Sequence, residues 1–367
     1  MRGEVVHLFL YDTGSEVNLD RVGELLNKHP AFEPLEIRKT APRYVDLPKP
    51  LRLSFSPIFL DTNLGTLQFN ISARIYGIGA VAFTLRTEFR VATVADLIPW
   101  GLLRMRNDRG ELQSLETLCR TYFDQILAGM KDALVEPYLV VAEPESYTVF
   151  VVTDYEGDVM NLLERDARPL AALLSGEPQP DRLGPEEVAD NLRHWYRYYE
   201  NDLVVVDWDY ALVVEPSGKY EDVLYIMEIA NLQLLELRVY DHYLDMVLDK
   251  AYDDLERFFS RGGIFKSARD IQIALADARI DLIRVTEGIE NIGKIFGDWY
   301  LAKLYLGLSE RFHVKEWEKT VQEKLEVVED LYALATHEVE HRRGVLLESL
   351  IVLLFVLDLV LIFILAK

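Results

Sequence analysis

The sequence predicts an α+β protein: a two-part α/β head, a coiled-coil-like stalk of long antiparallel helices, and one C-terminal transmembrane helix. Three observations support this fold class. Strand and helix patterns alternate up to about residue 219, proline and glycine are absent from Asp222 to Phe259, and residues 345–366 are almost entirely apolar. Because periods of two and of 3.6 residues separate strands from helices, we predict an N-terminal α/β domain at 1–135, a second α/β portion at 136–219, a long-helix stalk at 220–344 and the transmembrane helix at 345–366.

The head is predicted from local patterns. VVHLFLY (5–11) has the composition of a strand, and residues 18–29 have a helical pattern that Asn18 would cap. Two β-rich runs, 67–77 and 79–90, meet at a Gly-Ile-Gly sequence that is typical of a hairpin. A further helix is predicted at about 111–134. In the second portion, YLVVAE and SYTVFVVTDY are expected to pair as strands.

Three long helices are predicted after residue 220. They cover 222–259, about 268–312, and a third stretch from Lys315 into the apolar run. Long helices joined by short breaks favour an antiparallel hairpin or coiled coil. The last helix carries apolar residues at alternating spacings of three and four, the a/d pattern of a coiled coil: Leu325, Val328, Tyr332, Ala335 and Val339. We expect this seam and the transmembrane helix to mediate homo-oligomerisation.

Residues 345–366 are predicted to cross a membrane once. As a helix they would extend about 33 Å, close to the thickness of a bilayer core. Fifteen Leu, Ile, Val or Phe residues lie between Ser349 and Ala366; they contribute roughly −5 to −9 kcal/mol to insertion, against about +3 kcal/mol for Asp358. The alternative is a buried core helix, which usually keeps a polar stripe. Basic residues precede the run at 341–343, so we expect a tail-anchored protein of the cell membrane, in contact with the lipid bilayer, whose N-terminal part is cytoplasmic.

The composition excludes several classes of protein. The chain has 61 acidic and 39 basic side chains, a formal net charge of −22, which repels phosphate backbones and makes nucleic acid an unexpected partner. The lone cysteine, Cys119, excludes an intrachain disulfide and cysteine-rich zinc sites, and we expect a buried, inert thiol there. The first residues lack the apolar core of a signal peptide.

The stretch THEVEHRRG contains the H-E-x-x-H pattern at His337, Glu338 and His341. On a helix, this pattern presents two imidazoles to zinc and a carboxylate to a water molecule. On the seam described above, however, both histidines fall at positions away from the partner helix. A zinc site also needs a third ligand on another element and a water-excluding cleft. We therefore expect a solvated helix face, with a zinc hydrolase as the alternative.

Two other stretches carry chemistry-bearing side chains. In VVVDWDYAL, Asp207 and Asp209 would share one face of a strand and could hold Mg²⁺ or act as an acid/base pair; a plain polar sheet face is the preferred interpretation. HWYRYYEN (194–201) is rich in aromatic residues and is predicted to be a helix that packs its rings onto the sheet. No P-loop, dinucleotide fingerprint or nucleophile elbow is present. We therefore assign no catalytic residue, cofactor or metal ligand.

The C-terminal part resembles a known family. Three stretches are similar to the required-for-meiotic-nuclear-division proteins and their uncharacterised YagE-like relatives: YIMEIANLQLLELRVYDHYLD (225–245), ARIDLIRVTEGIENIGKIF (278–296) and RRGVLLESLIVLLFVLDLVLIF (342–363). The resemblance covers mainly residues 200–367. Glu348 and Asp358 match the two acidic positions of the terminal membrane helix of that family. The resemblance implies a scaffold or tether and offers no catalytic residue to carry over.

These expectations lead to a functional prediction. The chain is expected to be a non-enzymatic scaffold or tether, C-terminally anchored in the membrane, with a self-associating stalk and a head that holds a protein partner. Two alternatives stay open: a membrane-anchored zinc hydrolase that uses HEVEH, and a head that binds a small ligand or metal through Asp207 and Asp209.

Overall fold

The computed structural model describes residues 1–14, 16–26, 38–39, 50–135, 143–261 and 299–365. The chain divides into two compact units, Met1–Val239 with Val285–Glu318, and Tyr240–Arg284 with Lys319–Lys367. All described strands belong to the first unit. Helices α7 (Glu221–Arg261) and α11 (Val314–Leu365) each contribute residues to both units.

The first unit is built on a sheet of twelve described strands. Ten of them follow one another across the sheet in this order: β12 (Trp195–Tyr196), β13 (Leu203–Val206), β14 (Tyr210–Val214), β11 (Glu145–Asp154), β1 (Arg2–Asp12), β7 (Ala80–Arg90), β6 (Gly65–Tyr76), β5 (Ile58–Thr62), β8 (Arg104–Arg106) and β9 (Leu112–Ser114). β4 (Leu51–Ser54) pairs with β6 and with β3 (Arg38–Lys39), and a separate pair joins β2 (Glu16–Val17) to β10 (Leu134–Val135).

Strand β1 lies at the centre and corrects the predicted two-part head. It pairs antiparallel with β7 on one side and with β11 on the other, so strands from 1–135 and from 136–219 form one sheet. β11 and β14 are parallel, whereas the other described pairs are antiparallel. The predicted hairpin is confirmed as β6 and β7, because its Gly-Ile-Gly link brings Tyr76 opposite Ala80.

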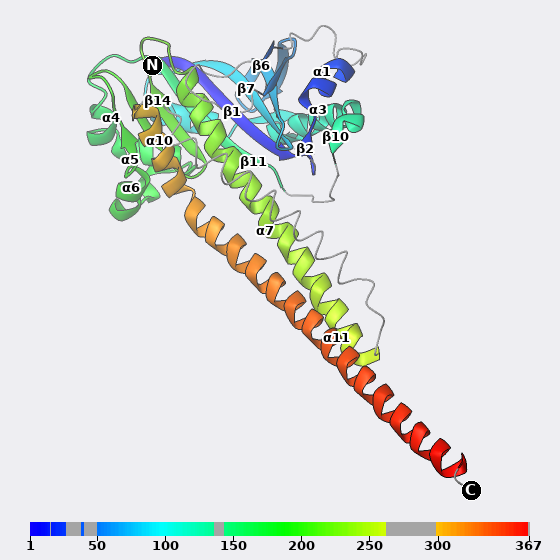
Figure 1. Cartoon of the computed structure of the whole chain (residues 1–367). Helices are drawn as coiled ribbons and strands as arrows, with labels where there is room; N and C mark the ends of the chain where they lie inside the picture. Colours follow the sequence, from blue (N-terminus) through cyan, green and yellow to red (C-terminus); the bar gives the residue numbers. More distant parts are fainter. Residues whose placement is uncertain (15, 27–37, 40–49, 136–142, 262–298, 366–367) are drawn as a thin grey trace. The chain divides into compact units, whose positions relative to one another are not determined.

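Short helices cover one face of this sheet (Figure 1). Alternate residues of β1 (Val5, Phe9 and Tyr11) point to this face and enter two neighbouring apolar clusters, as the period of two requires. The helices whose buried residues enter these clusters are α1 (Leu19–Leu26), η2 (Ala95–Leu97), α2 (Ile98–Gly101), α3 (Leu115–Gly129), η3 (Lys131–Ala133), α4 (Asn161–Glu164) and α5 (Ala167–Leu174). Two further elements, η4 (Pro180–Arg182) and α6 (Pro185–Asn191), contact α5.

Two predictions made from the sequence are confirmed on this face of the sheet. Asn18 caps α1 as predicted, because its Oδ1 accepts the Arg21 N–H at 3.1 Å. Cys119 of α3 is a free, fully buried thiol, as expected. Between the two clusters, the buried His7 imidazole bonds to Thr148 Oγ1 at 3.0 Å, and burial lowers its pKa to about 4. At neutral pH His7 is therefore an uncharged part of the core.

The first half of α7 crosses the opposite face of the sheet (Figure 1). Nearly every side chain from Val223 to Val239 is buried, which is the signature of a helix covered on all sides. Its carboxylates meet arginines that the alternate residues of β6 and β7 present: Glu228 pairs with Arg74, and Glu221 with Arg86. α10 (Trp299–Arg311) and the start of α11 complete the described part of this unit.

The second unit contains the rest of α7 and of α11. Lys324 of α11 pairs with Asp241 and Asp245 of α7, and Val321, Leu325 and Val328 are buried beside them. Two residues of the predicted oligomer seam are thus covered by their own chain. Within the first unit, Gln233 of α7 bonds to Glu318 of α11. α7 and α11 correspond to the first and third predicted helices, so the antiparallel packing of consecutive helices stays a prediction. Residues 268–298 of the helix predicted at 268–312 lie outside the described residues, and its last part is α10.

The structure also corrects the C-terminal prediction. Residues 345–365 end the helix α11, and within the described residues no helix is both long and apolar enough to cross a membrane. This finding overturns the predicted transmembrane helix, the single-pass location and the membrane-anchored tether.

Candidate functional site

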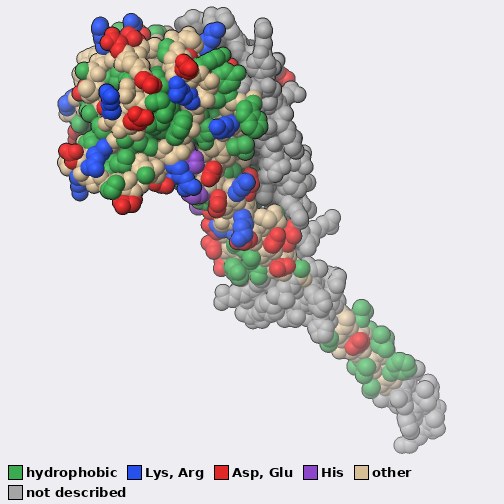
Figure 2. All heavy atoms as spheres, turned by 90° about the vertical axis from the view of Figure 1, so that its left-hand side faces the viewer, with side chains coloured by type: hydrophobic (Ala, Val, Ile, Leu, Met, Phe, Trp, Pro, Cys, Tyr) green, Lys and Arg blue, Asp and Glu red, His purple; other side chains and the backbone are tan. Residues whose placement is uncertain are grey.

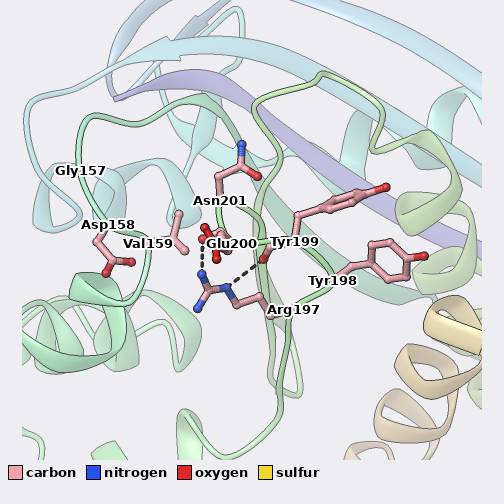
Figure 3. A pocket seen from close by; sticks show the side chains of 8 residues that line it. All are labelled: Gly157, Asp158, Val159, Arg197, Tyr198, Tyr199, Glu200 and Asn201. Atoms are coloured by element: carbon pink, nitrogen blue, oxygen red, sulfur yellow. Dashed lines mark hydrogen bonds between the residues drawn. The ribbon is translucent and has the colours of Figure 1, made fainter.

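A recess of about 780 Å³ opens on the surface of the first unit, at the end of the sheet that carries β12 (Figure 3). Two loops form it. One follows the carboxyl end of β11, and the other connects β12 to β13. The lining residues are Gly157, Asp158, Val159, Arg197, Tyr198, Tyr199, Glu200 and Asn201.

Local backbone bonds fix the first loop. Gly157 has φ +126°, a conformation that side-chain-bearing residues rarely adopt. The next residue, Asp158, accepts the Met160 N–H through Oδ1 at 3.0 Å and so starts the turn before α4. Val159 then enters the apolar cluster below the sheet, which anchors this wall of the recess to the core.

A buried carboxylate fixes the second loop. Asp202 is nearly inaccessible to solvent, and its two oxygens accept the backbone N–H groups of Tyr198 and Tyr199 at 2.8 and 3.0 Å. These bonds turn the chain between β12 and β13. The turn leaves the side chains of Tyr198 and Tyr199 outside the sheet, 60% and 64% exposed.

Arg197 lies across the centre of the recess and is already hydrogen-bonded to its own loop. Its Nε donates to the Tyr199 carbonyl at 2.9 Å, and its Nη2 donates to the Glu200 carbonyl (Figure 3). The guanidinium therefore serves largely to hold the loop. The carboxylates of Asp158 and Glu200 lie on either side of it and are exposed. The recess thus offers more negative than positive charge to a ligand.

Three tyrosine rings lie beside the recess, two on the second loop and one on α10. The ring of Tyr198 meets those of Tyr199 and Tyr300 edge to face, with centroids 4.7 and 5.5 Å apart. Both Tyr198 and Tyr199 point away from Asp158, onto the outer side of the loop (Figure 3). Trp299, the first residue of α10, is 82% exposed. We call Tyr198, Tyr199 and Tyr300 the aromatic ledge.

Helix α10 is fitted closely to the strand that leads into this site. A Cβ at Gly307 would lie 1.5 Å from the hydroxyl oxygen of Tyr196 in β12, so only glycine allows this approach. Lys303, one turn earlier, places its ammonium 5.7 Å from the centroid of the Tyr196 ring. α10 and β12 therefore form a rigid support for the ledge.

The sequence missed this site. HWYRYYEN was predicted to be a helix with its rings on the sheet, but Trp195 and Tyr196 form strand β12 and the next residues form the loop. The signal that could have found the site is the clustering of Tyr and Arg in one stretch, which is typical of interaction surfaces. It was outweighed because aromatic residues also pack well in cores.

Asp207 and Asp209 do not share one face of a strand, as the sequence had predicted. β13 ends at Val206 and β14 begins at Tyr210, so both residues belong to the connecting turn. The Asp207 carboxylate accepts Arg311 Nε at 2.6 Å; burial raises its pKa and Arg311 opposes that rise. Asp209 is exposed. Across the part of the chain that the structure describes, no three His, Cys, Asp or Glu residues gather to hold a metal ion.

The HEVEH stretch lies in α11, but the side chains of His337, Glu338 and His341 fall outside the described part of the chain. Its zinc-binding role, and the absence of one, both remain predictions. The side chain of Asp358 falls outside the description as well.

Fold and site together define a mixed α+β protein whose candidate site is an open, aromatic and acidic surface recess. The chain belongs to the family described as "Uncharacterized protein MJ0711, N-terminal domain", whose model matches residues 2–221. The uncharacterized protein MJ0711 of Methanocaldococcus jannaschii is 29% identical over 251 residues, which are 68% of this chain and 74% of that protein. No solved structure matches the chain.

This family replaces the one suggested by the C-terminal stretches. The resemblance to the required-for-meiotic-nuclear-division and YagE-like proteins is wrong, because the matching family model lies in the N-terminal part of the chain. That match includes every described strand and the whole recess, and it ends where α7 begins. Two of the misleading stretches, 225–245 and 342–363, lie in the long helices α7 and α11. In long helices Leu, Ile and Glu recur at similar spacings in unrelated proteins.

Proposed function

We propose that this chain is a protein-binding module that holds a cationic polypeptide segment of a partner at the aromatic ledge and the adjoining recess. The observation that carries the proposal is the exposure of Tyr198 and Tyr199 on a loop that buried Asp202 holds rigid. Tyr and Arg are enriched in protein interfaces, where rigid aromatic side chains bury much surface at a small entropic cost.

The charges around the ledge favour a cationic partner. The exposed carboxylates of Asp158 and Glu200 flank an arginine that its own loop carbonyls already occupy. Tyrosine faces attract ammonium and guanidinium groups by cation–π interaction. The net charge of −22 would also draw a basic segment toward the chain from a distance. Lysine or arginine side chains of a partner therefore suit both parts of the site.

The test is the binding of a fluorescently labelled oligolysine peptide, measured by anisotropy at low and at physiological salt. We expect Tyr198→Ala with Tyr199→Ala to weaken binding at least about fivefold, since each ring contributes about 0.5 kcal/mol or more. Replacing both residues by Phe should preserve binding, because the ring face is retained. Raising the salt concentration from low to physiological should weaken the contribution of net charge to the affinity, because salt screens exposed charges.

A matched control is Tyr252→Ala, a tyrosine of α7 that is 53% exposed in the second unit. It should leave the affinity unchanged. The proposal fails if the double alanine variant binds oligolysine as tightly as the parent, or if Tyr252→Ala lowers the affinity by the same factor. In either case the peptide would be held by the general negative charge and not by the ledge.

A further inference from the structure

One arginine on the face of the sheet that α7 crosses has no hydrogen-bond or ion-pair partner in the described part of the chain. Leu51 and Leu53 of β4 enter the apolar cluster under the short helices, so Arg52, which lies between them, points to the opposite face. The Nε atom of Arg52 is buried and unbonded. The residue as a whole is half-buried, so a small solute can approach its guanidinium group from solvent.

Two neighbouring arginines on this face are already paired. Arg74 of β6 lies directly opposite Arg52 across the strand pair, where side chains of one face are roughly 5 Å apart. Arg74 is bound to the buried carboxylate of Glu228. Arg86 of β7 donates to both carboxylate oxygens of Glu221. Arg52 therefore adds one unmatched positive charge to a set of matched ones.

This unmatched charge is unfavourable. Burial and the positive charges of Arg74 and Arg86 lower the pKa of Arg52, so the fold disfavours its charged form. Glu221 and Glu228 oppose this effect, but both are bonded to the other two arginines. On the face of the first unit drawn in Figure 2, by contrast, basic and acidic side chains are interspersed. An anion bound at Arg52 would supply the charge that the described chain does not.

Two serine hydroxyls lie beside Arg52 on the same face. Ser54 follows Arg52 by two residues in β4, and Ser72 of β6 lies directly opposite Ser54. Both serines are half-buried, and neither side chain is hydrogen-bonded within the described residues. A guanidinium and two hydroxyls side by side are hydrogen-bond donors that suit an oxyanion. We call Arg52, Ser54 and Ser72 the Arg52 patch.

We propose that the Arg52 patch binds the phosphate group of a small solute. Phosphate fits these donors better than a carboxylate does, because it presents at least three acceptor oxygens to one guanidinium and two hydroxyls. The patch lies on β4 and β6, whereas the recess and the aromatic ledge lie at the β12 end of the sheet, so this inference does not depend on the proposed function. Free phosphate and a phosphate monoester share this chemistry, and the test separates them.

The test follows the thermal unfolding of the full chain in phosphate, glycerol 3-phosphate or acetate, each compared with chloride at equal ionic strength and pH. We expect phosphate to raise the unfolding temperature of the parent along a saturating curve, by at least about 2 °C at ten times the dissociation constant. Acetate should give a smaller rise. An equal or larger rise with glycerol 3-phosphate would identify a phosphate monoester as the ligand, and a rise with phosphate alone would identify the free ion.

Substitutions in the patch make the test specific. Arg52→Gln should abolish the rise with phosphate, and Ser54→Ala with Ser72→Ala should weaken phosphate binding about fivefold or more, since two hydrogen bonds are lost. Arg104→Gln changes an exposed arginine of β8 and is the matched control, which should respond like the parent. In chloride, Arg52→Gln should unfold at or above the temperature of the parent, because it removes one of two opposed positive charges.

Four results would overturn the proposal. If Arg52→Gln and Arg104→Gln responded equally to phosphate, the rise would be a general effect of the salt. The absence of a saturating rise in the parent would exclude a phosphate site, and a rise with acetate as large as that with phosphate would exclude the preference for phosphate. A loss of stability on Arg52→Gln in chloride would mean that a group of the chain itself pairs with Arg52.

Discussion

Two apolar stretches of helix in this molecule have opposite surroundings. Val223–Val239 of α7 is buried almost throughout, between the sheet and neighbouring segments. In Val345–Leu357 of α11, the large apolar side chains that the structure describes are 48–69% exposed. Both stretches are apolar around most of the helix, the pattern of a helix that is covered on all sides. The periodicity alone therefore does not say which stretch its own chain covers.

The two stretches differ in their polar residues, which are paired in α7 and exposed in α11. In α7, Glu228 accepts from Arg74 and from the Tyr76 hydroxyl, and Asn231 donates to the Met227 carbonyl at 2.8 Å. Arg238 pairs with Glu145 at the start of β11. A helix that its own protein covers thus carries polar groups matched to partners elsewhere in the fold. The described part of α11 from Val345 to Leu357 has just Glu348 and Ser349 as polar residues, and both are exposed.

The largest effect is expected from the buried ion pair of α7. Glu228→Ala removes a carboxylate that is 1% exposed and leaves Arg74, whose side chain is 16% exposed, charged and without this partner. Such a loss typically costs about 3–5 kcal/mol of unfolding free energy. The matched change in α11, Glu348→Ala, removes an exposed carboxylate and should cost less than about 0.5 kcal/mol. Urea denaturation followed by fluorescence measures both, and equal costs would contradict the comparison.

A smaller effect is expected from deleting leucine side chains. Leu235 of α7 is completely buried, so Leu235→Ala should create a cavity and cost about 2–5 kcal/mol. Leu353 of α11 is 58% exposed, so Leu353→Ala should cost less than about 0.5 kcal/mol in a dilute sample. A loss above 2 kcal/mol for Leu353→Ala would mean that a part of the same chain covers α11 after all.

Local patterns predicted much of the sheet. The strand at 5–11 lies in β1, the runs 67–77 and 79–90 became β6 and β7, and Asn18 caps α1. These predictions hold because turn glycines, alternation and caps act over a few residues. The pairing of β1 with β11 joins residues more than a hundred positions apart, and no local pattern contains that information. The head therefore looked like two parts in the sequence and is one sheet in the structure.

The recess was missed for a different reason. Its loop geometry depends on Asp202, which accepts two backbone N–H groups and turns the chain at Tyr198. These bonds span three and four residues, but the aromatic spacing of 194–201 fits a helix equally well, and the aromatic pattern does not show which conformation Asp202 favours. At the turn of Asp207, by contrast, the partner lies far along the chain, because Arg311 of α10 pairs with a carboxylate that the sequence places near a strand end.

The smallest effect concerns a buried carboxyl of α7 whose partners are incomplete. Glu236 is 1% exposed, and its Oε1 has no hydrogen-bond partner among the residues that the structure describes. Burial raises the pKa of this carboxyl well above its usual value, and the negative charge of Asp12 adds to the rise. In the unfolded chain the same carboxyl ionises near pH 4.3. Between that pH and the higher folded pKa, the folded state binds more protons, so stability should fall as the pH rises.

Glu236→Gln should remove this dependence. The variant is expected to match the parent near pH 4 and to be more stable at pH 8, by about 1.4 kcal/mol for each unit by which the folded pKa is raised. Urea denaturation at a series of pH values measures the difference. Glu24→Gln, an exposed residue of α1, controls for the loss of one negative charge and should shift stability little at any pH. If Glu236→Gln were less stable than the parent at pH 8, the carboxylate would have a charged partner, and α7 would tolerate buried acids only in ion pairs such as that of Glu228.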